Sequence, residues 1–145
     1  MPTWVSNGYD EFIKRLPKEF TPLLKEIPPG RRSKNSDLKR AIAEESGRIL
    51  QAIPKDCRVI ALDENGKSWT TRKLADQMSD WASSGRDVAL IIGGADGLSH
   101  EVKQRADMTW SLSALTLPHA LVRVVLAEQL YRAWSLMTNH PYHRD

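Results

Sequence analysis

The residues best suited to chemistry lie after Trp110 in this 145-residue chain, where three of its four histidines are found. His140 and His143 belong to the segment Asn139-His-Pro-Tyr-His-Arg144, whose rings and hydrogen-bond donors suit stacking on a base and holding a phosphate. His119 stands apart, ahead of a long apolar pattern. The tail segment therefore predicts a nucleic-acid contact, with plain solvent exposure of its histidines as the alternative.

A second unusual residue is Arg123, within the apolar helical pattern from Ala120 to Trp134. At about 100° per residue, Glu128, Gln129 and Arg132 share one polar face of this helix. Arg123 points the opposite way, among apolar side chains, where an unpaired charge is very costly. The sequence therefore predicts that a carboxylate, a ligand or a second subunit meets this guanidinium.

The glycine-rich run Gly93-Gly-Ala-Asp-Gly97 follows a predicted strand, where glycine permits close approach of the backbone to a ligand. A tight turn is an equally good interpretation, because the run is neither the dinucleotide fingerprint nor a P-loop. No residue cluster predicts a metal site or an activated nucleophile, and Cys57 suits a buried position at a strand start. The residues therefore favour a transferase that uses a reactive cofactor, or a binding protein.

Composition favours one ordinary globular domain, which we expect to span residues 1–145. No apolar run approaches the roughly 20 residues of a membrane span, and a single cysteine suits the reducing cytoplasm. The net charge of +3 is compatible with an anionic partner. Basic residues gather after Pro28-Pro-Gly30, as a solvated loop or a phosphate-contacting patch: Arg31, Arg32, Lys34, Lys39 and Arg40.

Strands and helices alternate along the sequence, which predicts an α/β domain with a mostly parallel sheet. Apolar spacing and capping residues predict helices near residues 4–16, 38–53, 71–84, 99–106 and 120–134. Predicted strands cover 57–63, 87–92 and 110–117, with an edge strand at 20–27 and an Asn-Gly turn at 64–67. Ligands gather at the carboxyl ends of parallel strands, so we expect a site around Leu62, Gly93 and residues 115–117.

Three long motifs stand out: Ile91-Ile-Gly-Gly-Ala-Asp-Gly97, Trp110-Ser-Leu-Ser-Ala-Leu-Thr-Leu-Pro-His119 and Arg132-Ala-Trp-Ser-Leu-Met-Thr-Asn-His-Pro-Tyr-His143. With shorter matches elsewhere, they resemble the ribosomal RNA large-subunit methyltransferase H family, a branch of the SPOUT superfamily, over essentially the whole chain. The resemblance implies a SPOUT domain with helices on both faces of the sheet and a trefoil knot over about residues 88–145. It also implies a homodimer, with which the largely apolar final helix agrees. Family members begin with an apolar strand ahead of the segment matching Met1–Trp4, so we expect that strand to be missing here.

The resemblance implies S-adenosylmethionine as the cofactor. Leucines would supply an apolar slot for its adenine ring, and two glycines would let the backbone approach it closely. Carried over position by position, the pocket consists of Leu62, Gly93, Gly94, Leu112, Ser113, Ala114, Leu115, Thr116 and Leu117.

The implied reaction is methylation of N3 of a pseudouridine in helix 69 of 23S rRNA, on the assembled 70S ribosome, with no metal and no membrane partner. His143, with Tyr142 and Arg144, is the candidate group for orienting the base, contacting phosphate and removing the N3 proton. His119 is the alternative base. Arg123 has an equal claim to a structural role, and the alternatives for the whole protein are methylation of another RNA such as tRNA, or a non-catalytic ribosome- or RNA-binding factor. Candidate substrate-binding residues are Arg123, His140, Arg31 and Arg32.

Overall fold

The computed structural model describes residues 1–30, 38–94 and 97–142 of the chain. Three parallel strands form one sheet in the order β2-β1-β3. This arrangement confirms the predicted α/β class with a parallel sheet. The strands are β1 (Arg58–Ser68), β2 (Val88–Ile92) and β3 (Met108–Ser111).

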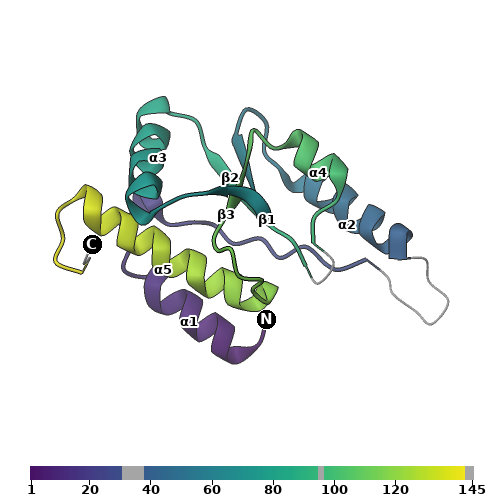
Figure 1. Cartoon of the computed structure of the whole chain (residues 1–145), viewed down its shortest axis with the longest axis horizontal. Helices are drawn as coiled ribbons and strands as arrows, with labels where there is room; N and C mark the ends of the chain where they lie inside the picture. The colour runs from purple at the N-terminus through teal and green to yellow at the C-terminus, as the bar shows by residue number, and fades with distance from the viewer. Residues whose placement is uncertain (31–37, 95–96, 143–145) are drawn as a thin grey trace.

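Helices cover both faces of this sheet (Figure 1). Three helices pack together on one face, and the other two pack together on the opposite face. None of the helices in the described part of the chain is both long and apolar enough to cross a membrane. The first layer contains α1 (Thr3–Ile13), α3 (Thr71–Ser84) and α5 (His119–Met137), and the second contains α2 (Leu38–Ala52) and α4 (His100–Arg105).

The central strand β1 supplies apolar side chains to both layers. Ile60 packs in the larger cluster with α1, α3 and α5, whereas its neighbour Val59 packs in the smaller cluster with α2 and α4. Both side chains are fully buried. Successive residues of a strand point to opposite faces, so a continuous apolar run is what a doubly covered sheet requires.

Local signals set several element ends as the sequence predicts. The Thr70 hydroxyl accepts a hydrogen bond from the backbone N–H of Lys73 and caps α3, and Ser99 caps α4 in the same way. Helix α3 ends at Gly85, whose φ of 71° lies in the left-handed region that glycine adopts without strain. Cys57 is buried directly ahead of β1, as expected.

The predicted edge strand at residues 20–27 is wrong. The chain forms a single 3-10 turn, η1 (Lys18–Phe20), and continues without regular structure to Gly30. The hydroxyl of Thr21 donates to the carbonyl oxygen of Pro17 at 2.9 Å, and Pro22 has no N–H to give to a sheet. Local hydrogen bonds therefore hold this segment beside the end of α1 instead of in a strand.

The predicted turn at residues 64–67 is also wrong, because these residues lie within β1. Leu62 and Lys67 both lie opposite Trp110, so the residues between them form an excursion of the strand from its register with β3. Gly66 permits it, because a Cβ at this position would lie 2.7 Å from the carbonyl carbon of Thr109. The Asn-Gly pair thus marks a bulge and not a chain reversal.

The strand predicted at residues 110–117 ends much earlier, at Ser111. Serine side chains redirect the chain there. The Ser111 hydroxyl donates to the carbonyl oxygen of Ser113 at 2.8 Å, and the Ser113 hydroxyl accepts from the N–H of Leu115 at 2.9 Å. Residues 112–118 therefore form a loop that leads into α5.

Candidate functional site at the carboxyl edge of the sheet

The carboxyl ends of the three strands meet at one edge of the sheet. Leu62 of β1 lies opposite Ile92 of β2 and Trp110 of β3. Directly after Leu62, the carboxylate of Asp63 forms an ion pair of 3.1 Å with Lys103 of α4. The structure therefore brings together the predicted ends at Leu62 and Gly93, whereas the third strand ends at Ser111 and not at residues 115–117.

The glycine-rich run forms a tight turn at this edge, as one of its two interpretations predicted. The N–H of Gly97 donates to the carbonyl oxygen of Gly94 at 3.1 Å, and Gly97 has a φ of 76°. Gly93 packs so closely against this turn that a Cβ would lie 2.8 Å from the carbonyl carbon of Gly97. Gly94 instead borders open space, since a Cβ there would meet no atom within 4 Å. Ala95 and Asp96 lie outside the described residues.

The loop of residues 112–117 lies at the same edge. The hydroxyl of Thr116 donates to Oε2 of Glu64 at 3.0 Å, which ties the loop to the excursion of β1. Leu115 is 73% exposed, while Leu112 and Leu117 are half-buried. One exposed and two half-buried leucines offer apolar surface on which a purine ring can pack, so this edge is suited to a nucleoside-like cofactor.

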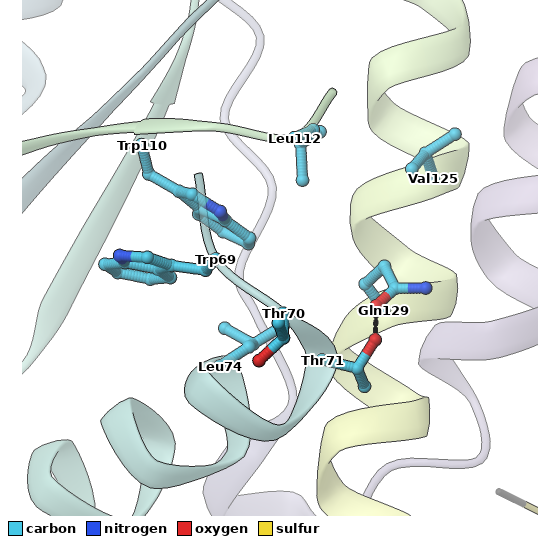
Figure 2. Close-up of a pocket in the computed structure, with 8 residues that line it drawn as sticks. All are labelled: Trp69, Thr70, Thr71, Leu74, Trp110, Leu112, Val125 and Gln129. Atoms are coloured by element: carbon cyan, nitrogen blue, oxygen red, sulfur yellow. Dashed lines mark hydrogen bonds between the residues drawn. The ribbon is translucent and has the colours of Figure 1, made fainter. Parts of the chain in front are cut away.

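A cleft of about 290 Å³ opens next to Leu112 (Figure 2). Trp69 and Trp110 form its aromatic wall and stack with ring centroids 4.7 Å apart. On the other side, the hydroxyl of Thr71 donates a hydrogen bond of 2.7 Å to the amide oxygen of Gln129. The full lining consists of Trp69, Thr70, Thr71, Leu74, Trp110, Leu112, Val125 and Gln129.

Sequence reasoning missed Trp69 and Gln129 as site residues. A signal for Trp69 was present, because a large aromatic side chain stands directly before the helix cap Thr70 at a strand–helix junction. Gln129 was placed correctly on the polar face of α5, but its partner Thr71 is 58 positions away in the sequence. Such a pairing follows only from the packing of α3 on α5.

The C-terminal segment folds back along α5. Asn139, with a φ of 56°, reverses the chain after the helix. The ring of His140 packs on Trp134 at 5.5 Å between centroids, and its Nδ1 accepts a hydrogen bond of 3.2 Å from the N–H of Tyr142. The ring of Tyr142 in turn lies 4.5 Å from that of Tyr131. The described part of the tail is therefore packed on the helix and does not extend into solvent.

Glu128 joins this tail to the cleft through hydrogen bonds. Its carboxylate accepts from the Tyr142 hydroxyl at 2.9 Å, from Nε of Arg132 at 2.9 Å and from the amide nitrogen of Gln129 at 2.8 Å. Gln129 continues the network to Thr71 of α3. Burial, followed by the hydrogen bond to Glu128, raises the pKa of Tyr142 above its usual value near 10. Tyr142 therefore stays protonated at neutral pH and acts as a hydrogen-bond donor to Glu128.

The remaining candidates fall in different places. His119 is the exposed first residue of α5, nine residues before Glu128, which corresponds to roughly 14 Å along the helix. Arg123 meets a carboxylate, the first of its three alternatives: its Nη1 lies 3.0 Å from Oε1 of Glu26.

Within the described residues, no group of three or more histidine, cysteine or acidic side chains is placed to hold a metal ion. Four candidates lie outside the described residues: Arg31, Arg32, His143 and Arg144.

Comparison with known proteins places this geometry in a family. The family described as "Predicted SPOUT methyltransferase" matches residues 1–143 of the chain. The chain belongs to this SPOUT methyltransferase family. The membership expected from the three sequence motifs is thereby confirmed.

Curated relatives of this SPOUT methyltransferase carry the name "Ribosomal RNA large subunit methyltransferase H". The relative from Thioalkalivibrio sulfidiphilus is 56% identical over 145 residues, covering 100% of this chain and 93% of the relative. Those from Marinomonas sp. (strain MWYL1) and Methylococcus capsulatus are 56% and 52% identical, each covering 99% of this chain and 93% of the relative. A methyltransferase must hold a methyl donor and an acceptor side by side. The carboxyl edge and the cleft adjoin each other, since Leu112 belongs to both.

Proposed function

We propose that this SPOUT methyltransferase methylates N3 of a pseudouridine in helix 69 of 23S rRNA, on the assembled 70S ribosome and hence in the cytoplasm. The observation that carries the proposal is 52–56% identity, over nearly the whole chain, with relatives named for methylation of large-subunit ribosomal RNA. The resemblance of the motifs at 91–97, 110–119 and 132–143 supports the choice of nucleotide and atom.

The carboxyl edge fits S-adenosylmethionine, the cofactor that SPOUT methyltransferases generally use. Exposed Leu115 and half-buried Leu62 offer an apolar slot, and the open space at Gly94 leaves room for close approach. When bound, the cofactor supplies a methyl group whose transfer leaves the electron pair of the broken carbon–sulfur bond on sulfur. The residues proposed to hold it are Leu62, Gly93, Gly94 and the run Leu112, Ser113, Ala114, Leu115, Thr116 and Leu117.

The protein must also orient the acceptor base and take up the proton that N3 loses. His143 is our proposed proton acceptor, with His119 as the alternative. Tyr142 contributes orientation, because its raised pKa keeps the phenol a hydrogen-bond donor to Glu128. Arg144, His140, Arg123, Arg31 and Arg32 are proposed to contact the RNA.

We further propose that residues 1–145 form one domain that works as a homodimer and carries a trefoil knot over about residues 88–145. Uncovered apolar side chains support the dimer, since Trp4 is 57% and Leu23 85% exposed. A second subunit also allows His119 and the tail bound to Glu128 to serve one site, although they lie apart on α5 of a single chain.

Transfer of labelled methyl groups to three acceptors tests the proposal. With 70S ribosomes from cells lacking the modification, free 23S rRNA and tRNA offered in parallel, we expect label chiefly in the ribosomes. Preferential labelling of tRNA would establish the alternative substrate. Calorimetry with S-adenosylmethionine separates the remaining alternative, because a non-catalytic RNA-binding factor that lost the pocket would give no binding heat.

A further inference from the structure

The cleft beside Leu112 contains several hydrogen-bond donors that have no acceptor within the described residues. Nε1–H of Trp110 is buried and has no acceptor within the described residues, an arrangement that proteins generally avoid. A carboxylate only accepts, so the amide nitrogen of Gln129 faces Glu128, and its second N–H has no acceptor among the described residues. The amide oxygen already accepts one hydrogen bond, from the hydroxyl of Thr71.

Thr70 adds a further donor at the rim of the cleft. Its oxygen accepts from the N–H of Lys73 as the cap of α3, which leaves the hydroxyl hydrogen to donate. The rest of the lining is apolar, from Leu74, Val125 and the two indole rings. A ligand that fits these surroundings is flat and apolar on its faces and carries carbonyl oxygens on its edge.

The position of the cleft links it to the proposed reaction. Leu112 lines it and is also the first residue of the run proposed to hold the cofactor. No other residue of that run lines the cleft, so the cleft adjoins the cofactor site without coinciding with it. Methyl transfer requires the acceptor atom to lie directly beside the methyl group.

The volume of the cleft also limits what it takes. About 290 Å³ is just below the roughly 300–1,000 Å³ typical of ligand pockets. Such a volume suits a single planar ring and is small for a whole nucleoside cofactor. Enzymes that modify a base extrude it from the stack into a pocket lined by aromatic rings and polar groups that read its edge.

We infer that this cleft is the pocket for the extruded acceptor base, and that its donors select a uracil-type ring. The inference rests on the proposed function, since it identifies where the substrate of that reaction binds. In a uracil-type ring two carbonyl groups flank N3, so donors from Trp110, Thr70 and Gln129 would grip the ring on both sides of the reacting nitrogen. Cytosine presents an amino group in place of one carbonyl and is therefore disfavoured.

Nuclear magnetic resonance of the indole N–H groups tests the inference without requiring activity. The full-length protein, saturated with S-adenosylhomocysteine, is titrated with pseudouridine 5′-monophosphate and separately with cytidine 5′-monophosphate, and Trp110→Phe assigns the signal. We expect the Trp110 signal to move with the pseudouridine nucleotide and to stay in place with the cytidine nucleotide. Val125→Phe, which fills the cleft, should abolish the movement, whereas Gln104→Leu on the exposed surface of α4 should not.

Three results would overturn it. If the Trp110 signal moves when S-adenosylhomocysteine is added and does not move further with nucleotide, the cleft binds the cofactor. If the signal moves only with protein concentration, the cleft binds a second copy of the chain. If both nucleotides move the Trp110 signal equally, the donors of the cleft do not select a uracil-type ring.

A kinetic measurement separates recognition of the base from a merely structural role. Gln129→Leu should lower kcat/KM for ribosomes about tenfold, as expected for one lost hydrogen bond in a closed site, and leave the Kd for S-adenosylmethionine unchanged. The variant should also lose the preference for the pseudouridine nucleotide over the cytidine nucleotide. If the protein methylates ribosomes but the Trp110 signal does not respond to the pseudouridine nucleotide, only the assignment of the cleft as the base pocket is refuted. If the signal responds but no methyl group is transferred, the proposed function is refuted.

Discussion

The two faces of the sheet are stabilised in different ways. On the α2–α4 face, Val59 and Val102 sit in a small apolar cluster and are fully buried. On the α1–α3–α5 face, the larger apolar cluster is bordered by the network in which Glu128 joins the Tyr142 hydroxyl to Gln129. The first face is built around an apolar cluster, whereas the second also contains a cleft and a folded-back tail. Substitutions on the two faces should separate stability from methyl transfer.

Glu128→Leu should have the largest effect. The hydroxyl of Tyr142, Nε of Arg132 and the amide nitrogen of Gln129 all lose their acceptor. We expect the free energy of unfolding to fall by about 2–3 kcal/mol, measured by urea denaturation. Methyl transfer to ribosomes should fall roughly 100-fold, because the tail and the amide are no longer held in place.

Val102→Ala provides the matched control on the other face. It removes fully buried apolar volume and should lower the free energy of unfolding by about 2 kcal/mol. Transfer per folded molecule should stay at the wild-type rate. A comparable loss of transfer in both variants would show that the Glu128 network acts only through stability.

Gly93→Ala should have the next largest effect, and Gly47→Ala is its counterpart in α2. A Cβ at position 93 would lie 2.8 Å from the Gly97 carbonyl carbon, so the turn must shift. Calorimetry should show S-adenosylmethionine bound about tenfold more weakly, equivalent to about 1.4 kcal/mol. Gly47 is exposed with open space around it, so alanine there should stabilise the helix by about 0.5–1 kcal/mol and leave binding unchanged. Unaltered affinity in the position 93 variant would move the cofactor away from this turn.

Tyr142→Phe should have a smaller effect and remove a pH dependence. The folded protein raises the pKa of this phenol above the value near 10 of the unfolded chain. The stability it contributes is therefore complete below about pH 10 and is lost as the pH rises through the raised pKa. At pH 7 the variant should transfer methyl groups about three- to tenfold more slowly. The difference in tyrosinate absorbance between wild type and variant, followed against pH, should give a pKa above that of free tyrosine. A pKa at or below that of free tyrosine would contradict the hydrogen bond to Glu128.

Arg123→Leu should have the smallest effect on stability. Its ion pair with Glu26 is partly exposed, with the two side chains 24% and 48% accessible, and such pairs contribute less than about 1 kcal/mol. The midpoint of thermal unfolding should be lower in the variant than in the wild type at low salt, and equal in the two proteins at high salt, where the ion pair is screened. A large salt-independent loss would instead indicate that Arg123 is buried against a second subunit.

Much of the fold follows from residues that act locally. Thr70, Ser99 and Gly85 set helix ends through bonds and backbone angles within a few residues, so the sequence was sufficient to place them. The apolar runs at residues 57–63 and 87–92 likewise predicted the parallel pair β1 and β2.

The parts that the sequence did not predict depend on distant partners. The excursion of β1 exists because both Leu62 and Lys67 align with Trp110, a register that no local pattern indicates. The site shows the same division. The ends at Leu62 and Gly93 were predicted, whereas the third strand was expected to run to Leu117 and ends at Ser111. The link from Glu128 to Tyr142 requires the chain reversal at Asn139.

The most direct measurement is the position of the methyl group in the product. Ribosomes lacking the modification are incubated with the protein and S-adenosylmethionine, helix 69 is excised, and its nucleosides are analysed by mass spectrometry. The account predicts a single N3-methylpseudouridine in helix 69. A methyl group at another atom or outside 23S rRNA, or no methyl group with a folded protein that binds the cofactor, would contradict it.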